Sequence, residues 1–307
     1  MELSAKSNES NHKSIRVQGG LNMGLNSRTS EKIAFALLTL SAMIVASFVV
    51  IILAYIIYNG YSAINIGFLT EMPRMRMTQG GIYPAIVGTV YLIIGSMAVA
   101  LPTGIMAAIY LNEYAGENRT TWLIEMAINN LAGTPSVVFG LFGLALFVKY
   151  FGFGSSLLAS CLTLSLLIIP VIIRSTQEAL IAVPNEYRES SLALGVSKWQ
   201  TIRYVVLPAA VPGIVTGSIL SIGRVAGETA PILLTGVAYF LPRLPESIHS
   251  QFMALPYHLF VLATSGTNIT QTRPLQYGTA LVLLMIVLGL NIIAVLIRRH
   301  YRQKLKI

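Results

Sequence analysis

Apolar stretches alternate with polar segments along this chain and predict its architecture. Windows without a charged residue cover 33–58, 77–112, 126–148, 150–173 and 274–297. A helix needs about 20 residues to cross the roughly 30 Å hydrocarbon core of a bilayer, so each window is long enough for one span. A further apolar region is bounded by prolines. The predicted helices are 33–58, 82–111, 126–148, 154–174, 211–237 and 276–297. The pattern therefore predicts an all-α membrane protein with six transmembrane helices.

Composition agrees with a membrane location. Of the 307 residues, 54% are hydrophobic and only 11% are charged, whereas soluble domains carry about 25% charged residues. The first apolar run is longer than the roughly 7–15 residues of a secretory signal, so 33–58 is expected to be a retained span. Residues 1–32 are polar, rich in Ser, Asn and Lys, and are predicted to form a disordered cytoplasmic tail.

The distribution of Lys and Arg predicts the orientation. With both termini cytoplasmic, the inner segments hold fifteen of these residues and the outer segments hold five, as the positive-inside rule requires. The outer loops are then 59–81 and 238–275, the large cytoplasmic loop is 175–210, and 298–307 is a basic cytoplasmic tail. The net charge of +9 gathers beside the spans, which indicates topology and not nucleic-acid binding.

The cytoplasmic loop predicts a helix, a glycine turn and a second helix. Pro184 marks the first helix start, and Gly195 is expected to end that helix in the left-handed conformation. Ser197 is expected to cap a second helix over about 198–206, which Pro208 would end. On this pattern alone, an ordinary hairpin between two spans is the alternative.

From Glu189 the loop reads E-S-S-x3-G-x9-V-x-L-P. It resembles the EAA loop of ABC-importer permeases, E-A-A-x3-G-x9-I-x-L-P, with Ser190, Ser191 and Val205 as the departures. The resemblance implies docking onto a separate ATP-hydrolysing subunit. The implied coupling surface consists of Glu189, Ser190, Ser191, Gly195, Leu207 and Pro208. The sequence has no G-x-x-x-x-G-K-[ST] motif, so ATP and Mg are expected on the partner ATPase and no cofactor on this chain.

Two charges, Arg224 and Glu228, fall inside the fifth predicted span. A charge at mid-span costs about 2.5–3.5 kcal/mol on insertion scales. The pair either neutralises itself in packing, since i, i+4 residues share a helix face, or lines a polar path for a charged solute. Arginine matches tetrahedral oxyanions by bidentate hydrogen bonding, and a carboxylate accepts a hydrogen bond from an anion that keeps a proton, as phosphate does. The small residues around them either admit a neighbouring helix or leave room for a pathway.

Three stretches resemble the phosphate-importer permeases of the PstA type. They are R-V-A-G-E-T-A-P at 224–231, AGTPSVVFGLFG at 132–143 and FMALPYHLFVLATS at 252–265. The resemblance implies the type-1 ABC importer permease fold over residues 82–297, in a prokaryotic cytoplasmic (inner) membrane. The implied partners are a PstC-like second permease, a PstB-like ATPase dimer and a PstS-like extracytoplasmic phosphate-binding protein. It also implies that Arg224 and Glu228 lie along the pathway.

Several alternatives stay open at this point. Thr134 and Ser136 either line the pathway or pack within a kinked helix. The cargo is inorganic phosphate or another oxyanion such as sulfate or molybdate. From a different class, a secondary transporter would use Arg224 and Glu228 as an ion relay. No nucleophile–base arrangement is apparent, so the chain is expected not to be an enzyme and to have neither catalytic nor metal-binding residues.

Overall fold

A computed structural model of the chain describes residues 27–77, 79–264 and 269–304. The chain divides into two units, residues 1–52 and 53–307, and each is considered by itself. The described residues of the first unit belong to α1 (Ser27–Gly60), which ends in the second unit. Residues 33–58 of this helix carry no charged side chain, as expected of a membrane span. Helix α1 begins inside the predicted tail 1–32, and the remainder of that tail lies outside the described residues.

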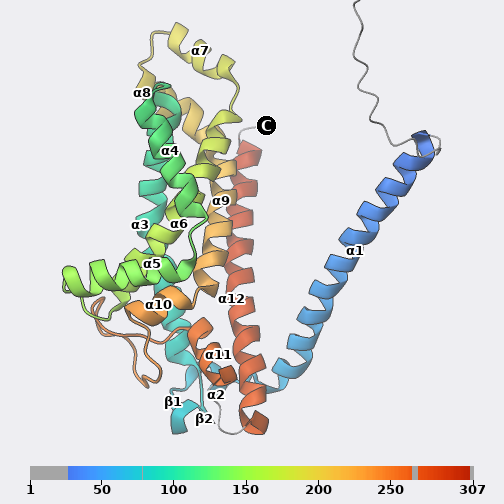
Figure 1. Ribbon diagram of the computed structural model, residues 1–307, viewed down its shortest axis with the longest axis vertical. Coiled ribbons are helices and arrows are strands. Elements are labelled where there is room, and N and C mark those ends of the chain that lie inside the picture. The colour runs from blue at the N-terminus through green and yellow to red at the C-terminus, as the bar shows by residue number, and fades with distance from the viewer. Residues whose placement is uncertain (1–26, 78, 265–268, 305–307) are drawn as a thin grey trace, which may run out of the picture. The chain divides into compact units, whose positions relative to one another are not determined.

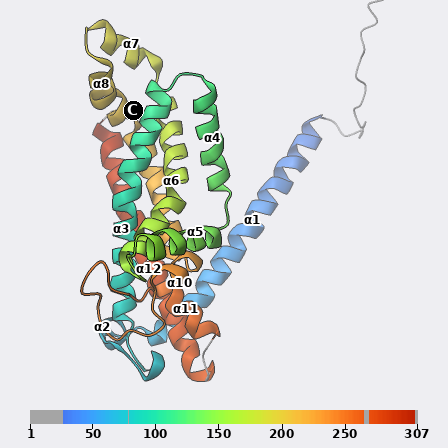
Figure 2. The ribbon, with the colours of Figure 1, turned by 60° about the vertical axis from the view of Figure 1, so that its left-hand side comes forward.

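Four long helices form the centre of the second unit. They are α3 (Tyr83–Ile109), α6 (Leu157–Ile181), α9 (Leu207–Gly227) and α12 (Ile269–Lys304), and they lie side by side (Figures 1 and 2). Helix α3 continues through η3 (Tyr110–Tyr114), a π-helical segment. Leu164 and Ile168 of α6 are fully buried, and a side chain at Gly104 of α3 would clash with Ile172 of α6. The apolar runs thus pack by close approach of small residues against large ones.

The third predicted span, 126–148, is wrong as a single helix. The chain forms α4 (Arg119–Ala132), then α5 (Ser136–Gly143) with the π-helical η4 (Leu144–Tyr150). It bends by 104° between α4 and the α5–η4 arm. In Figure 1, α5 runs across the bundle while α4 runs along it. The break falls at Gly133-Thr134-Pro135. A proline clashes with the carbonyl four residues before it, and the residue preceding a proline leaves the helical region.

The fifth predicted span, 211–237, also differs. Helix α9 ends at Gly227, Glu228 has an extended backbone (φ −71°, ψ 132°), and α10 (Ala230–Thr235) follows. Gly227 is the fourth residue before Pro231, which is where a proline ring removes the helical hydrogen bond. Within the described residues, five helices are long and apolar enough to cross a membrane, and the number is six if the bent pair α4–α5 counts as one span. The predicted number of six spans is therefore reached only if the broken helix pair α4–α5 is counted as the third span.

One end of the second unit is built from short elements. They are η1 (Tyr61–Ala63), α2 (Ile66–Thr70), β1 (Pro73–Arg74), η2 (Met75–Met77), β2 (Gln79–Gly80) and α11 (Leu255–Thr264). Strands β1 and β2 pair antiparallel, with Pro73 opposite Gly80. The chain before α11 turns back into the bundle, because Phe252 is fully buried and its neighbour Met253 is 2% exposed. Within the described residues, parts of both predicted outer loops therefore form short folded elements.

The opposite end carries the predicted cytoplasmic loop and the last turns of α12 (Figure 1). Helix α6 continues to Ile181, so the loop is shorter than the predicted 175–210. It contains α7 (Asn185–Ala193), α8 (Lys198–Thr201) and the π-helical η5 (Ile202–Val206). The predicted tail 298–307 is helical as far as Lys304, and its last three residues lie outside the described residues.

Candidate functional site

The charged pair of the fifth span lies at the break between α9 and α10. Arg224 is in the last turn of α9, and its Nε is 3.5 Å from Glu228 Oε1. The Arg224 side chain is 35% exposed and that of Glu228 is 16% exposed. The carboxyl end of a helix carries partial negative charge, which favours the arginine there. The two side chains do lie together, a contact that both alternatives allow, but Glu228 lies just beyond the helix and not one turn further along it.

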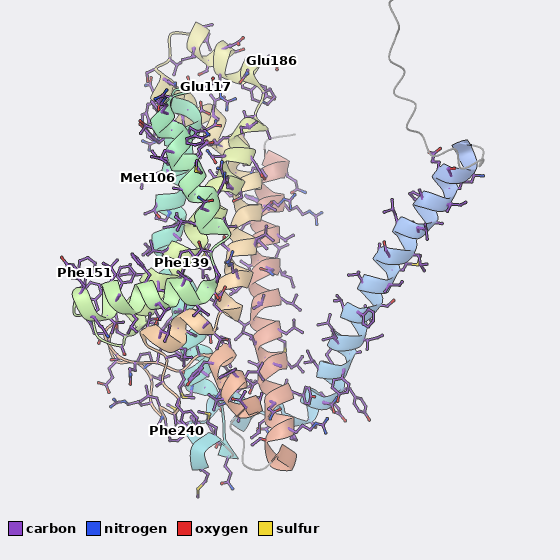
Figure 3. The ribbon with its side chains drawn as sticks, in the orientation of Figure 1. Met106, Glu117, Phe139, Phe151, Glu186 and Phe240 are labelled. Atoms are coloured by element: carbon purple, nitrogen blue, oxygen red, sulfur yellow. The ribbon has the colours of Figure 1, made fainter. Side chains whose placement is uncertain are left out.

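The two helix breaks lie at the same level of the bundle. Phe139 of α5, marked in Figure 3, belongs to one buried cluster with Val225, Ala226 and Ile232, the residues on either side of the α9–α10 break. A Cβ added at Gly140 would lie 2.9 Å from the Cα of Pro231. Helix α5 therefore packs directly on α10.

The other two predicted pathway residues lie in the α4–α5 break. Thr134 Oγ1 donates to Asn130 O at 2.9 Å, and both Thr134 and Ser136 are half-buried. Among the described residues, neither side chain has a hydrogen bond to Arg224 or Glu228. The structure thus brings the two breaks to one level without joining these four side chains directly. Their role in a pathway stays a prediction.

Glycines divide α9 into a packed part and an open part. A side chain at Gly213 would clash with Ala179 of α6, and one at Gly217 would clash with Ser175. A Cβ added at Gly223 or Gly227 would meet nothing within 4 Å. The small residues of the first part therefore admit a neighbouring helix, as one reading predicted, whereas a pathway beside the second part stays a prediction. The open part is the one that holds Arg224.

The loop predicted to be cytoplasmic has the expected turn. Gly195 has φ +77°, and its N–H donates to Leu192 O at 2.9 Å. Ser197 caps α8 by accepting from the N–H of Gln200, whose side chain reaches back to the Ser197 N–H. The helix does not end at Pro208, however, since it runs from Lys198 to Gly227. The preceding π-helical segment changes the hydrogen-bond register, so the proline falls in the first turn of α9, where its missing N–H does little harm.

The loop residues that the EAA-loop resemblance named differ in their exposure. Glu189 and Ser190 are exposed on α7, whereas Ser191 is 8% exposed and its Oγ lies 2.9 Å from Thr201 Oγ1 of α8. Apolar side chains around the turn are also exposed, with Leu194 at 83%. The half-buried Leu207 and Pro208 begin α9. The loop therefore presents an exposed outer surface on a hydrogen-bonded pair of helices.

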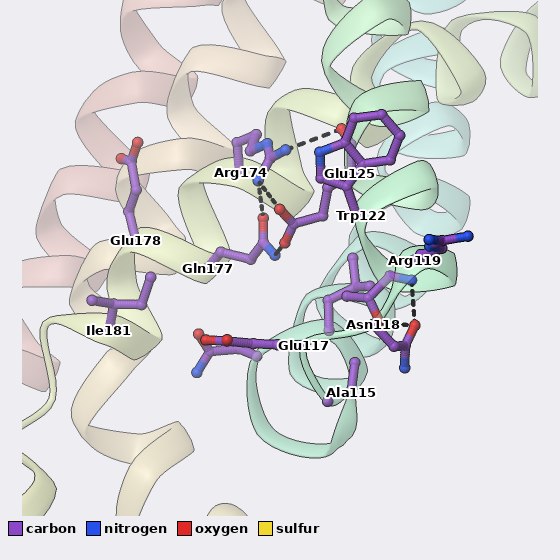
Figure 4. A pocket seen from close by; sticks show the side chains of 14 residues that line it. Ala115, Glu117, Asn118, Arg119, Trp122, Glu125, Arg174, Gln177, Glu178 and Ile181 are labelled. Atoms are coloured by element: carbon purple, nitrogen blue, oxygen red, sulfur yellow. Dashed lines mark hydrogen bonds and ion pairs between the residues drawn. The ribbon is translucent and has the colours of Figure 1, made fainter.

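A polar cluster between α4 and α6 was not predicted. Arg174 donates to Asn129 Oδ1 and Gln177 Oε1, both at 2.9 Å, and its Nη1 is 4.0 Å from Glu125 Oε2. Arg174, Gln177 and Glu125 border a cavity of about 940 Å³ near the loop end, which Glu117 also lines (Figure 4). The sequence indicated only that Arg174 and Gln177, three residues apart, share one helix face. It gave no sign that Glu125, which belongs to another span, would join them.

A bundle of apolar helices with a charged pair at a central helix break, and a polar helix–turn–helix at one end, is typical of a membrane permease. Residues 100–307 match the family described as binding-protein-dependent transport system inner membrane component. The chain belongs to this family.

Named relatives fall within the same class. The chain is 34% identical over 282 residues to the probable ABC transporter permease protein YqgI of Bacillus subtilis, covering 88% of this chain and 95% of that protein. It is 40% identical over 219 residues to the phosphate transport system permease protein PstA 1 of Mycobacterium tuberculosis, covering 71% of each. It is 31% identical over 273 residues to PstA of Haemophilus influenzae, covering 89% of this chain and 95% of that protein.

Solved structures share the fold. A chain of the MetNI methionine ABC transporter in an inward-facing conformation aligns with a TM-score of 0.54 at 18% identity, covering 72% of this chain and 94% of that chain. A chain of a bacterial ABC transporter for the import of alginate aligns with a TM-score of 0.61 at 12% identity, covering 88% of this chain and 96% of that chain. The predicted ABC importer permease fold is thereby confirmed.

Proposed function

We propose that this chain is a permease subunit of an ATP-driven inorganic phosphate importer and forms half of the translocation pathway. The observation that carries the proposal is the partly exposed Arg224–Glu228 pair at a helix break whose neighbouring glycines leave open space. Ionisable residues inside membrane spans usually face the bundle interior or a water-filled cavity. Relatives named as phosphate transport permeases support the choice of cargo.

The chemistry of the pair suits a partly protonated oxyanion. The guanidinium of Arg224 offers a planar set of donors that pairs with two oxygens of a tetrahedral anion. Glu228, which already lies 3.5 Å from Arg224, would repel a fully ionised anion and accept a hydrogen bond from a protonated one. Phosphate keeps at least one proton near neutral pH, whereas sulfate does not. The pair therefore favours phosphate over sulfate.

The loop formed by α7, Gly195 and α8 would serve as the docking element for an ATPase. Its exposed Glu189, Ser190 and Leu194 form a surface that a separate subunit could cover, and exposed apolar side chains of this kind often mark an interaction site. ATP and Mg would be bound by that subunit. A second permease would complete the pathway on the open side of Arg224, and an extracytoplasmic binding protein would deliver the anion.

The test is uptake by the assembled transporter in proteoliposomes. Labelled phosphate and labelled sulfate are compared for the unaltered chain, for Arg224→Gln and for the control Arg299→Gln, an exposed residue at the end of α12. Loss of one charge-assisted interaction of about 1.5–3 kcal/mol predicts a fall in phosphate uptake of roughly 10- to 150-fold for Arg224→Gln. The control should be unchanged.

Three results would contradict the proposal. Normal uptake by Arg224→Gln would reduce the ion pair to a packing role. Preference for sulfate or molybdate would favour the other oxyanions. Solute movement by the purified chain without ATP or an ATPase would identify a secondary transporter.

A further inference from the structure

A second ion pair joins the cytoplasmic loop to the helices of the bundle. Arg188 of α7 lies against Glu113 in the π-helical end of α3, with 2.8 Å between Nη2 and Oε1 and 3.4 Å between Nε and Oε2. The Arg188 side chain is 17% exposed and that of Glu113 is 7% exposed. The two residues are 75 positions apart in the chain. This pair is therefore a buried tertiary contact.

The guanidinium has partners for all five of its N–H donors. Besides the two bonds to Glu113, Nη2 donates to Leu180 O at 2.8 Å and Nη1 donates to Val183 O at 2.8 Å. The fifth bond runs from Nη1 to Asn185 Oδ1 at 3.3 Å. The Leu180 carbonyl belongs to the last turn of α6, where it also accepts from the Val183 N–H at 3.2 Å, and the Val183 carbonyl follows it. One side chain thus connects α7, the end of α3 and the end of α6.

Helix α7 also contacts α8 and the π-helical η5. Of its residues, Ser191 is buried, and its hydroxyl bonds to Thr201 of α8, which connects the two helices of the loop to each other. Among the side-chain hydrogen bonds and ion pairs of the described residues, those of Arg188 are the ones that tie α7 to α3 and α6. The end of α3 also meets α8, since Lys198 Nζ lies 5.0 Å from the centre of the Tyr114 ring.

We propose that Arg188 is the positioning residue of the loop, holding α7 to the ends of α3 and α6 so that a displacement of α7 moves these two helices. The inference rests on the proposed function, in which an ATPase binds the loop. It assigns to the Arg188–Glu113 pair the transmission of movement and not the binding of the ATPase, since both carboxylate and guanidinium are largely buried beneath the exposed face of α7.

The test uses the complete transporter, with the ATPase co-purified and reconstituted. Arg188→Lys keeps the charge, but an ammonium has its three donors on one atom and does not reproduce the planar fork. Arg188→Lys and Glu113→Gln should each retain the ATPase within twofold, lower phosphate uptake at least tenfold and raise the ATP hydrolysed per phosphate moved. The matched control is Glu117→Gln, which removes a carboxylate four residues from Glu113 that is exposed and forms no hydrogen bond or ion pair among the described residues.

A reversible covalent link keeps the test decisive if the single variants lose the ATPase or express poorly. Glu113→Cys/Arg188→Cys is prepared with Cys161→Ser, because Cys161 is the one native cysteine. Bridging the pair with bifunctional methanethiosulfonate reagents of graded length should restore uptake, and reduction should abolish it again.

The outcomes separate the two proposals. If the unaltered transporter moves no phosphate with ATP, the proposed function fails whatever the variants do. If it does, and Arg188→Lys matches it in uptake and in ATP per phosphate, the role of Arg188 is overturned. Failure of every bridging reagent to restore uptake overturns it as well.

Discussion

Substitution of Gly195 tests whether the loop geometry governs ATPase binding. Gly195 has φ +77°, and a Cβ added there would meet nothing within 4 Å. The cost of Gly195→Ala is therefore purely conformational, about 1–2 kcal/mol for an L-residue in the left-handed region. That cost corresponds to roughly a 5- to 30-fold lower population of the native turn. Asparagine tolerates this region better, so the population of the native turn in Gly195→Asn should lie between those of the unaltered chain and Gly195→Ala.

Proline provides the extreme of the series. Its ring fixes φ near −65° and removes the N–H, which at Gly195 donates to Leu192 O at 2.9 Å. The assay is titration of the detergent-solubilised permease with its labelled ATPase, and the apparent dissociation constant should rise in the order Gly, Asn, Ala, Pro. Gly116→Ala is the control, since Gly116 has open space and no left-handed φ. Equal affinities for Gly195 and Gly195→Ala would refute the reasoning.

Three further tests concern packing, hydrogen bonding and titration, and each measures thermal unfolding of the purified chain. Gly140→Ala should destabilise by about 1–3 kcal/mol, because the new Cβ would press on the Pro231 backbone; an unchanged melting temperature would contradict the α5–α10 contact. Ser191→Ala should cost about 1 kcal/mol by leaving the Thr201 hydroxyl unpaired, and adding Thr201→Val should recover most of it. Burial lowers the pKa of His258 to about 4, so the unfolded chain binds the extra proton first, and stability should fall as the pH drops from about 6.5 towards 4. His258→Leu should flatten that dependence, and an equally steep fall in the variant would exclude His258 as its origin.

Four of the six spans, the loop and its turn were predicted from the sequence as they are found, because each depends on local signals. Charge-free windows locate helices, and a glycine after an apolar helix end indicates a left-handed cap, as found at Gly195. Prolines were harder to interpret. Pro102 and Pro170 lie inside continuous helices, whereas Pro135 and Pro231 follow helix breaks. In the two breaks a glycine precedes the proline by two or four positions, while Pro102 and Pro170 directly follow apolar residues that pack in intact helices.

The tertiary ion pairs had no local signal. Arg188 and Glu113 are separated by 75 positions, and Arg174 meets Glu125 across two different spans. In the sequence, each of these residues is indistinguishable from any other charged residue near a membrane interface. Their pairing depends on how α3, α4 and α6 are arranged, which periodicity does not specify.

The continuity of the helix at Pro208 changes how the loop relates to the pathway. The sequence predicted that the second loop helix stops at Pro208 and that a separate span begins at 211. Instead one 30-residue helix runs from Lys198 to Gly227, and at about 1.5 Å per residue it spans roughly 40 Å from the loop to Arg224. In the proposed importer, a displacement of the loop end of this helix would be transmitted along its axis to the point where the helix stops. Beyond Gly227 the backbone is extended and α10 is anchored on α5 through Gly140, so the movement must be taken up at Glu228. In the proposed importer, the separation and exposure of Arg224 and Glu228 have to change for an anion to pass.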